Sequence, residues 1–157
     1  MSYTVKQRLT IKWNRAVMFE ILDFIKYWNS RKEHNWLVDY DLSISDVPAM
    51  MDVYLETRRG IPMRDICNVF GSTRASGNYG DGCSYSDGDC CCINIHFKDG
   101  EIIQIQEILT TWDDTDKNNI GPVVSLGKIY SKSEIEDFKK EHDIEVTPKL
   151  SIDELSW

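Results

Sequence analysis

Two runs of alternating apolar and polar residues, CCCINIHF at 90–97 and EIIQIQEIL at 101–109, stand on either side of Lys98-Asp99-Gly100. Successive side chains of a strand point to opposite faces of a sheet, so a period of two indicates a strand with one buried face. Asp-Gly between two such runs is a strong turn signal. The sequence therefore predicts an antiparallel hairpin, and the fold must contain a sheet built around it.

The register of this hairpin can be predicted from the face that each side chain would occupy. A two-residue Asp-Gly loop would place Ile95 opposite Gln104 and mix polar with apolar residues on both faces. A three-residue loop with Gly100 left-handed pairs Ile95 with Ile103, and we predict this loop because one buried face specifies register strongly. The apolar face would hold Cys91, Ile93, Ile95, Phe97, Ile103 and Ile105, and the other face Cys90, Cys92, Asn94, His96, Gln104 and Gln106.

The rest of the chain predicts a mixture of strands and helices. Residues 3–13 alternate with period two and carry Lys6, Arg8 and Lys12 on the polar face, which is typical of a half-buried strand. Asn14 can cap a helix whose apolar stripe runs to about residue 32. Further helices are predicted over 46–60, 62–71 and 131–142, and short strands near 42–44 and 123–130.

These elements predict an α+β fold with a mainly antiparallel sheet, including the 90–97/101–109 hairpin, packed with about four helices. A chain of 157 residues suits one core better than two, so residues 1–144 are predicted to form a single domain. Residues 145–157 contain Pro148 and few core candidates, and are predicted to form an extended tail. Residues 72–89 are predicted to form one long glycine-rich loop, and loops of this length are usually functional or disordered.

The charge of the chain narrows the choice of partner. The net charge is −8, and it is concentrated after residue 40, where eleven Lys or Arg face twenty-two Asp or Glu. Such a chain is repelled at long range by nucleic acid and anionic lipid, but is attracted to a basic protein surface. The simpler interpretation is that the charge only keeps the protein soluble. We expect a basic protein partner, with no direct nucleic-acid or membrane binding.

The cysteines and the first residues indicate a compartment. Five cysteines, three of them adjacent, form an odd number, and residues 1–13 alternate in polarity rather than forming the apolar core of a signal peptide. No run of the sequence approaches the length of apolar residues that a membrane span needs. We therefore expect free thiols in a reducing, cytoplasmic setting.

The spacing of possible ligand residues can be compared with the spacing that zinc, calcium and phosphate sites need. Cys83, Cys90, Cys92 and His96 are zinc-ligand types, but along a straight strand residues 92 and 96 lie about 13 Å apart, too far for one zinc ion. The acidic run 114–118 copies the first ligand positions of an EF-hand, but Ser125 stands where the loop needs a bidentate glutamate. The glycine-rich segment 71–78 lacks the lysine of a phosphate-binding loop. We expect no cofactor.

Two alternatives to a pure interaction protein stay open. One is a metal- or small-ligand-binding domain that uses residues 72–89. The other is a hydrolase in which Cys83 or Cys90 is paired with His96 or His34, although no arrangement of these residues can be argued from spacing.

A recognition surface is the interpretation that we favour. The 72–89 segment sets tyrosines among Gly, Ser, Asn and Asp, a composition typical of adaptable protein-binding surfaces. The hairpin would bring this segment and the acidic stretch after Trp112 to the same end of the sheet. The predicted partner-binding residues are Tyr79, Asp81, Tyr85, Asp87, Asp89, Trp112, Asp113, Asp114 and Asp116. We expect a non-catalytic inhibitor of a basic, nucleic-acid-handling protein, in the style of phage counter-defence proteins (anti-CRISPR or anti-restriction) or toxin-immunity proteins.

Overall fold

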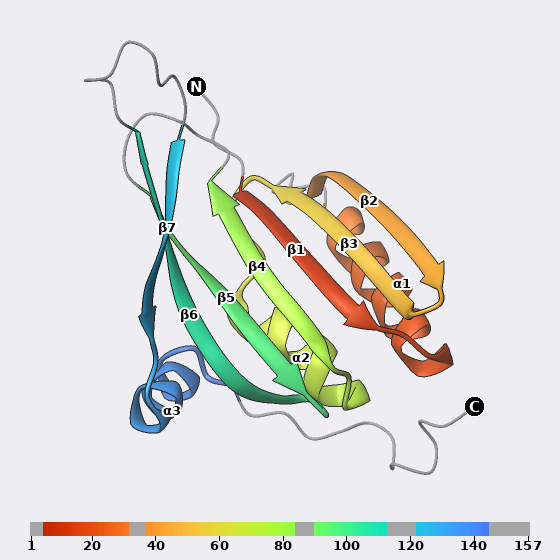
Figure 1. Ribbon diagram of the computed structural model, residues 1–157. Coiled ribbons are helices and arrows are strands. Elements are labelled where there is room, and N and C mark those ends of the chain that lie inside the picture. The colour runs from red at the N-terminus through yellow and green to blue at the C-terminus, as the bar shows by residue number, and fades with distance from the viewer. Residues whose placement is uncertain (1–4, 32–36, 84–89, 113–121, 145–157) are drawn as a thin grey trace.

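The computed structural model describes residues 5–31, 37–83, 90–112 and 122–144. Within these ranges the chain forms one seven-stranded sheet in which every neighbouring pair of strands is antiparallel, in the order β2-β3-β1-β4-β5-β6-β7 (Figure 1). The strands are β1 (Val5–Lys12), β2 (Leu37–Asp46), β3 (Ala49–Thr57), β4 (Gly77–Cys83), β5 (Cys90–Lys98), β6 (Glu101–Trp112) and β7 (Pro122–Ile129). The predicted α+β class and antiparallel sheet are confirmed.

Three helices pack against this sheet: α1 (Arg15–Ser30), α2 (Met63–Thr73) and α3 (Lys132–Glu141). In α1 the Asn14 side chain accepts a hydrogen bond from the Val17 amide at 3.0 Å, which satisfies one of the free N–H groups at the helix start. In α3, Ser131 and Glu134 form the capping box that their spacing predicts. Figure 1 shows α1 and α2 behind the sheet, and α3 beside the foot of β7.

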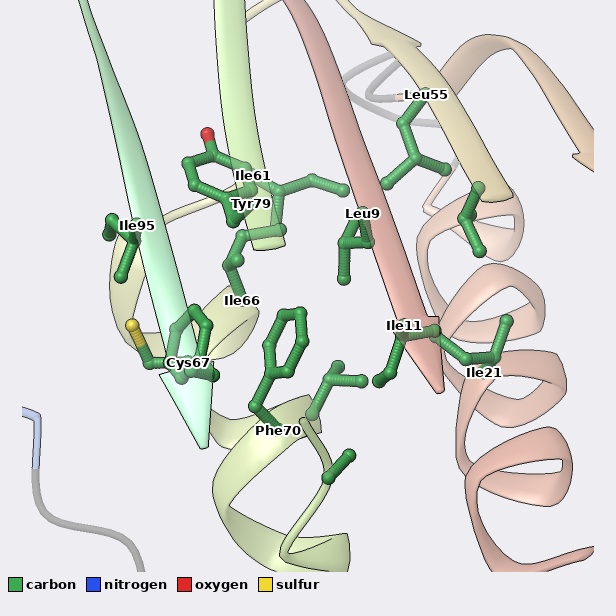
Figure 2. Close-up of a cluster of buried hydrophobic side chains, with 14 of the residues drawn as sticks. Leu9, Ile11, Ile21, Leu55, Ile61, Ile66, Cys67, Phe70, Tyr79 and Ile95 are labelled. Atoms are coloured by element: carbon green, nitrogen blue, oxygen red, sulfur yellow. The ribbon is translucent and has the colours of Figure 1, made fainter. Parts of the chain in front are cut away.

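The core lies between the helices and one face of the sheet. β1 contributes Leu9 and Ile11, and its other face exposes Lys6, Arg8 and Lys12, as its alternation predicts. Figure 2 shows how aliphatic side chains from the strands meet those of α1 and α2. The buried set further includes Val17, Ile21, Met51, Val53, Leu55, Ile66, Phe70, Tyr79, Ile95, Phe97, Ile105, Ile135 and Phe138.

The helix predicted over 46–60 is wrong, because this segment forms the second strand of the β2–β3 hairpin. Met51, Val53 and Leu55 alternate and are fully buried, whereas Met50 and Tyr54 lie on the opposite face. Because Met50 and Tyr54 add apolar side chains to the face opposite Met51, Val53 and Leu55, the sequence does not alternate cleanly and resembles the broad apolar side of a helix. The described part of the chain therefore has three helices rather than about four.

The long loop predicted over 72–89 is also wrong for half of its length, and its residues 84–89 lie outside the described ranges. Helix α2 continues to Thr73, and Gly77–Cys83 forms β4, which pairs with β1 on one side and β5 on the other. A Cβ on Gly77 would lie 2.1 Å from the carbonyl oxygen of Thr10, and the φ of Gly77 is +155°. Gly77, one of the glycines that suggested a loop, thus allows β4 to approach β1 closely.

The β5–β6 hairpin is confirmed, but its predicted register is wrong. Asp99 and Gly100 both have positive φ, +52° and +84°, so the turn has two residues and pairs Phe97 with Ile102. A shift in register between His96 and Phe97 then places Ile95 opposite Ile105, not opposite the predicted Ile103. Ile103 is the extra residue in this bulge, and it is 49% exposed instead of joining the core.

Candidate functional site

Strand ends gather at one end of the sheet, the upper end in Figure 1. Cys90, the first residue of β5, lies opposite Thr110 of β6, and Trp112, the last residue of β6, lies opposite Pro122 of β7. The chain therefore leaves the sheet at this end before residues 84–89 and again before residues 113–121. After each segment it returns to the sheet at the same end. These two segments contain five aspartates and one lysine.

Most of the predicted partner-binding residues fall in these two segments. Tyr85, Asp87, Asp89, Asp113, Asp114 and Asp116 lie outside the described residues, as does the side chain of Trp112. Their role in binding stays a prediction, as does the extended tail over 145–157.

Tyr79 belongs to the core, contrary to its predicted place on a surface loop. Its side chain is fully buried, and Figure 2 shows its hydroxyl pointing away from the aliphatic cluster. Gln7 Nε2 donates hydrogen bonds to the Tyr79 hydroxyl at 2.9 Å and to the Ile61 carbonyl at 3.0 Å, and Gln7 Oε1 accepts from the Ile61 amide at 2.7 Å. Tyr79 therefore joins β4 to β1 inside the fold and has no exposed surface to offer a partner.

Asp81 is half-buried next to this network. Its Oδ1 accepts a hydrogen bond from the Ile93 amide at 2.8 Å, and its Oδ2 accepts from the Tyr79 hydroxyl at 3.4 Å. Burial raises the pKa of Asp81, and these hydrogen bonds offset part of the effect. Asp81 thus lines a cavity of about 450 Å³ instead of projecting from a loop.

The same cavity brings basic residue types near the buried network. Arg59, Arg64 and His142 line it together with Gln7, Tyr79 and Asp81. Arg64 of α2 lies 3.5 Å from Asp143, which follows α3, and both side chains are mostly exposed. The charges around this cavity are mixed, so it does not extend the acidic surface expected from the sequence.

The face of the sheet opposite the core carries a polar surface that was not predicted as a site. Lys6, Arg8 and Lys12 project from β1, and a shallow cavity of about 270 Å³ lies on β4–β6. Its lining consists of amide and imidazole side chains: Asn78, Asn94, His96, Gln104 and Gln106. The alternation of β5 and β6 did predict which of these residues share a face, but not that β4 would lie beside them.

On this face of the sheet, acidic and basic side chains come from different strands. Asp52 and Glu56 project from β3 on the same side as the β1 cations, and Arg8 Nε lies 3.4 Å from Asp52 Oδ1. Acidic side chains therefore occupy the β2–β3 side of the face, and basic and neutral polar side chains occupy its centre.

The described residues show no arrangement that supports a metal site or a Cys/His hydrolase. Across the described ranges, no group of three or more His, Cys, Asp or Glu side chains is placed to hold a metal ion. His96 Nδ1 contacts the Asn78 side chain on the open face. Burial raises the pKa of Cys67 to about 12, so this thiol is protonated at neutral pH and is a poor nucleophile. His34 and the side chains of Cys83 and Cys90 lie outside what the structure describes.

No family model, no curated protein and no solved structure matches the chain. Among the described helices, none is long and apolar enough to cross a membrane.

Proposed function

We propose that this protein is a non-catalytic inhibitor that binds a basic, nucleic-acid-handling protein. The observation that supports the proposal is the position of the strand ends: Cys90 lies opposite Thr110, and Trp112 opposite Pro122. These pairs anchor the acidic segments 84–89 and 113–121 at one end of a hydrogen-bonded sheet. The first segment leads into β5 and the second follows β6, and these two strands are neighbours in the sheet, so both segments can act on one partner surface together.

The chemistry of the partner follows from charge. Five aspartates in two short segments favour a cationic groove, which is the surface that a nuclease or other nucleic-acid-binding protein presents to phosphates. An acidic protein in that groove would exclude nucleic acid by occupying the same positive charges. We assign the chain to the style of inhibitor represented by phage counter-defence (anti-CRISPR or anti-restriction) or toxin-immunity proteins, acting in the cytoplasm without a cofactor.

The proposal is tested by capture with matched charge variants. The test variant carries Asp113→Asn, Asp114→Asn and Asp116→Asn. The control carries Asp23→Asn, Asp137→Asn and Glu141→Gln, which remove the same charge from exposed positions on α1 and α3. We expect wild type and control to retain a nucleic-acid-binding protein from the native cell and to inhibit it, and the test variant to lose most of both.

Two outcomes would refute the proposal. Equal capture by test and control variants would show that the acidic segments are not the binding surface. Capture of a partner with an acidic surface, or of none, would refute the proposed partner class.

A further inference from the structure

A second cavity, of about 340 Å³, lies between the end of α2, the β5–β6 turn and α3. We propose that it binds a small organic monoanion, a carboxylate on a partly apolar body, through the guanidinium of Arg74. This inference concerns a different part of the molecule from the acidic segments and does not rest on the proposed inhibitor function.

Arg74 has a backbone conformation that favours glycine. It follows the last residue of α2 with φ +53° and ψ +39°, the left-handed conformation in which helices commonly end on glycine. The Arg74 amide donates to the Gly71 carbonyl at 3.2 Å, and the Ala75 amide donates to the Phe70 carbonyl at 2.9 Å. Any side chain here costs stability relative to glycine, and such a cost often marks a functional position.

The polar atoms of the Arg74 side chain are not all satisfied within the described fold. Among the described residues its buried Nε has no hydrogen-bond partner. Asp99 and Glu101 line the same cavity, yet neither forms an ion pair with Arg74. A buried donor without a partner is costly, and a planar guanidinium is suited to a bidentate carboxylate. A carboxylate ligand would supply the missing acceptor.

A second cation reaches the cavity from α3. Lys139 Nζ lies 3.9 Å from Glu101 Oε2 and 3.4 Å from Glu136 Oε1, and both glutamates are mostly exposed. Exposed ion pairs of this kind are weak, so a bound carboxylate can replace Glu101 as the partner of Lys139. Arg74 and Lys139 would then hold one negative charge between the ends of two helices.

The rest of the lining sets the class of ligand. Phe97, Ile102, Ile144 and the protonated thiol of Cys67 are apolar, so the body of the ligand can be apolar or aromatic. Asp99 and Glu101 add two negative charges at the same cavity, and these disfavour a polyphosphate or another multiply charged ligand. The composition favours a monocarboxylate.

The walls of the cavity are held by hydrogen bonds. The Gly100 amide donates to the Ala75 carbonyl at 2.8 Å, and the Asp99 amide donates to Ser76 Oγ at 2.9 Å. A Cβ on Gly100 would lie 3.0 Å from the Arg74 Cα, so the turn packs directly on the end of α2. Arg74 is therefore presented by a fixed frame, which lowers the ordering cost of binding.

The test is a titration of the full chain with benzoate, followed by amide NMR shifts of Arg74 and Gly100 and by calorimetry. Benzylamine serves as the cation of similar shape, and phenyl phosphate as the more highly charged anion. We expect benzoate to bind with a dissociation constant in the millimolar range or tighter, phenyl phosphate at least several-fold more weakly, and benzylamine not to bind.

Variants separate binding from folding. Arg74→Asn keeps a residue that tolerates the left-handed conformation, so it should unfold at the same or a higher urea concentration while weakening benzoate binding by tenfold or more. Lys139→Gln should weaken it several-fold, and the exposed control Arg58→Gln should leave it unchanged. Absence of benzoate binding, equal binding of benzylamine or phenyl phosphate, or unchanged binding by folded Arg74→Asn would overturn the proposal.

Discussion

Gln7 on β1 donates a hydrogen bond to the hydroxyl of Tyr79 on β4 at 2.9 Å, and both side chains are buried. Replacing Tyr79 with Phe would remove that acceptor and the hydrogen bond to Asp81 while keeping the ring. We expect the free energy of unfolding to fall by about 1–2 kcal/mol, measured by urea denaturation. Tyr40→Phe, on the exposed side chain of β2, is the control and should change it by less than about 0.5 kcal/mol. If the two variants lost equal stability, the buried network would have no special role.

Asp81 gives a prediction for pH. Burial raises its folded pKa above the unfolded value, so the folded state binds the proton more tightly and this contribution to stability is present at low pH. The contribution is lost as pH rises from the ordinary aspartate pKa, about 3.9, through the raised value. Asp81→Asn keeps an acceptor for the Ile93 amide and removes the titration. We expect urea unfolding to show that the stability of Asp81→Asn relative to wild type increases from pH 4 to pH 7.

Asp65 is a second carboxyl whose pKa burial raises, so wild-type stability alone would not isolate Asp81. Comparing Asp81→Asn with wild type at each pH removes the contribution of Asp65. A stability difference that stays constant with pH would contradict the assignment to Asp81.

Two glycines of β4 should respond differently to alanine. At Gly77 the added Cβ would lie 2.1 Å from the Thr10 carbonyl oxygen at φ +155°, so Gly77→Ala should cost more than about 2 kcal/mol. At Gly80 the nearest atom would be Asn94 Nδ2 at 3.7 Å, so Gly80→Ala should change stability by less than about 1 kcal/mol. Thermal or urea unfolding of both variants checks this, and equal losses would contradict the β1–β4 pairing.

The bulge in β6 predicts opposite behaviour for two isoleucines that the sequence places on one face. Ile105 is fully buried opposite Ile95, so Ile105→Ala should lower the free energy of unfolding by about 2–5 kcal/mol. Ile103 is 49% exposed, and Ile103→Ala should cost less than about 1 kcal/mol. Similar losses for both variants would instead support the three-residue loop.

The limits of sequence-based prediction are clear at these positions. The alternation of β1 and the caps of α1 and α3 depend on local chemistry, and the structure confirms them. Tyr79 and Ile103 could not be placed in this way. Tyr79 is buried because β4 is inserted between β1 and β5, a long-range pairing that a glycine-rich sequence conceals. Ile103 is exposed because a bulge permits a two-residue turn and still keeps Ile95 opposite Ile105.

The candidate site was predictable only in part for the same reason. That residues 84–89 and 113–121 flank one end of a hairpin follows from counting strand residues. That Asp81 would instead line a cavity with Gln7 and Tyr79 required knowing which strand lies beside β4. Arg74 carried no signal in the sequence, because its left-handed backbone and unpartnered Nε depend on where α2 ends and what surrounds it.

The proposed inhibitor function makes a kinetic prediction. Charges that steer two proteins together act mainly on the association rate, and salt screens them. For the captured partner, replacing Asp113, Asp114 and Asp116 with Asn should lower the association rate constant by about tenfold or more at low ionic strength. The deficit should shrink as salt approaches about 0.5 M, where the Debye length is only about 4 Å. Surface plasmon resonance at several salt concentrations measures this, with the α1/α3 control variant expected to keep most of the wild-type rate. If the test variant instead changed only the dissociation rate, and equally at all salt concentrations, these aspartates would act as direct contacts rather than as the steering charges proposed for them.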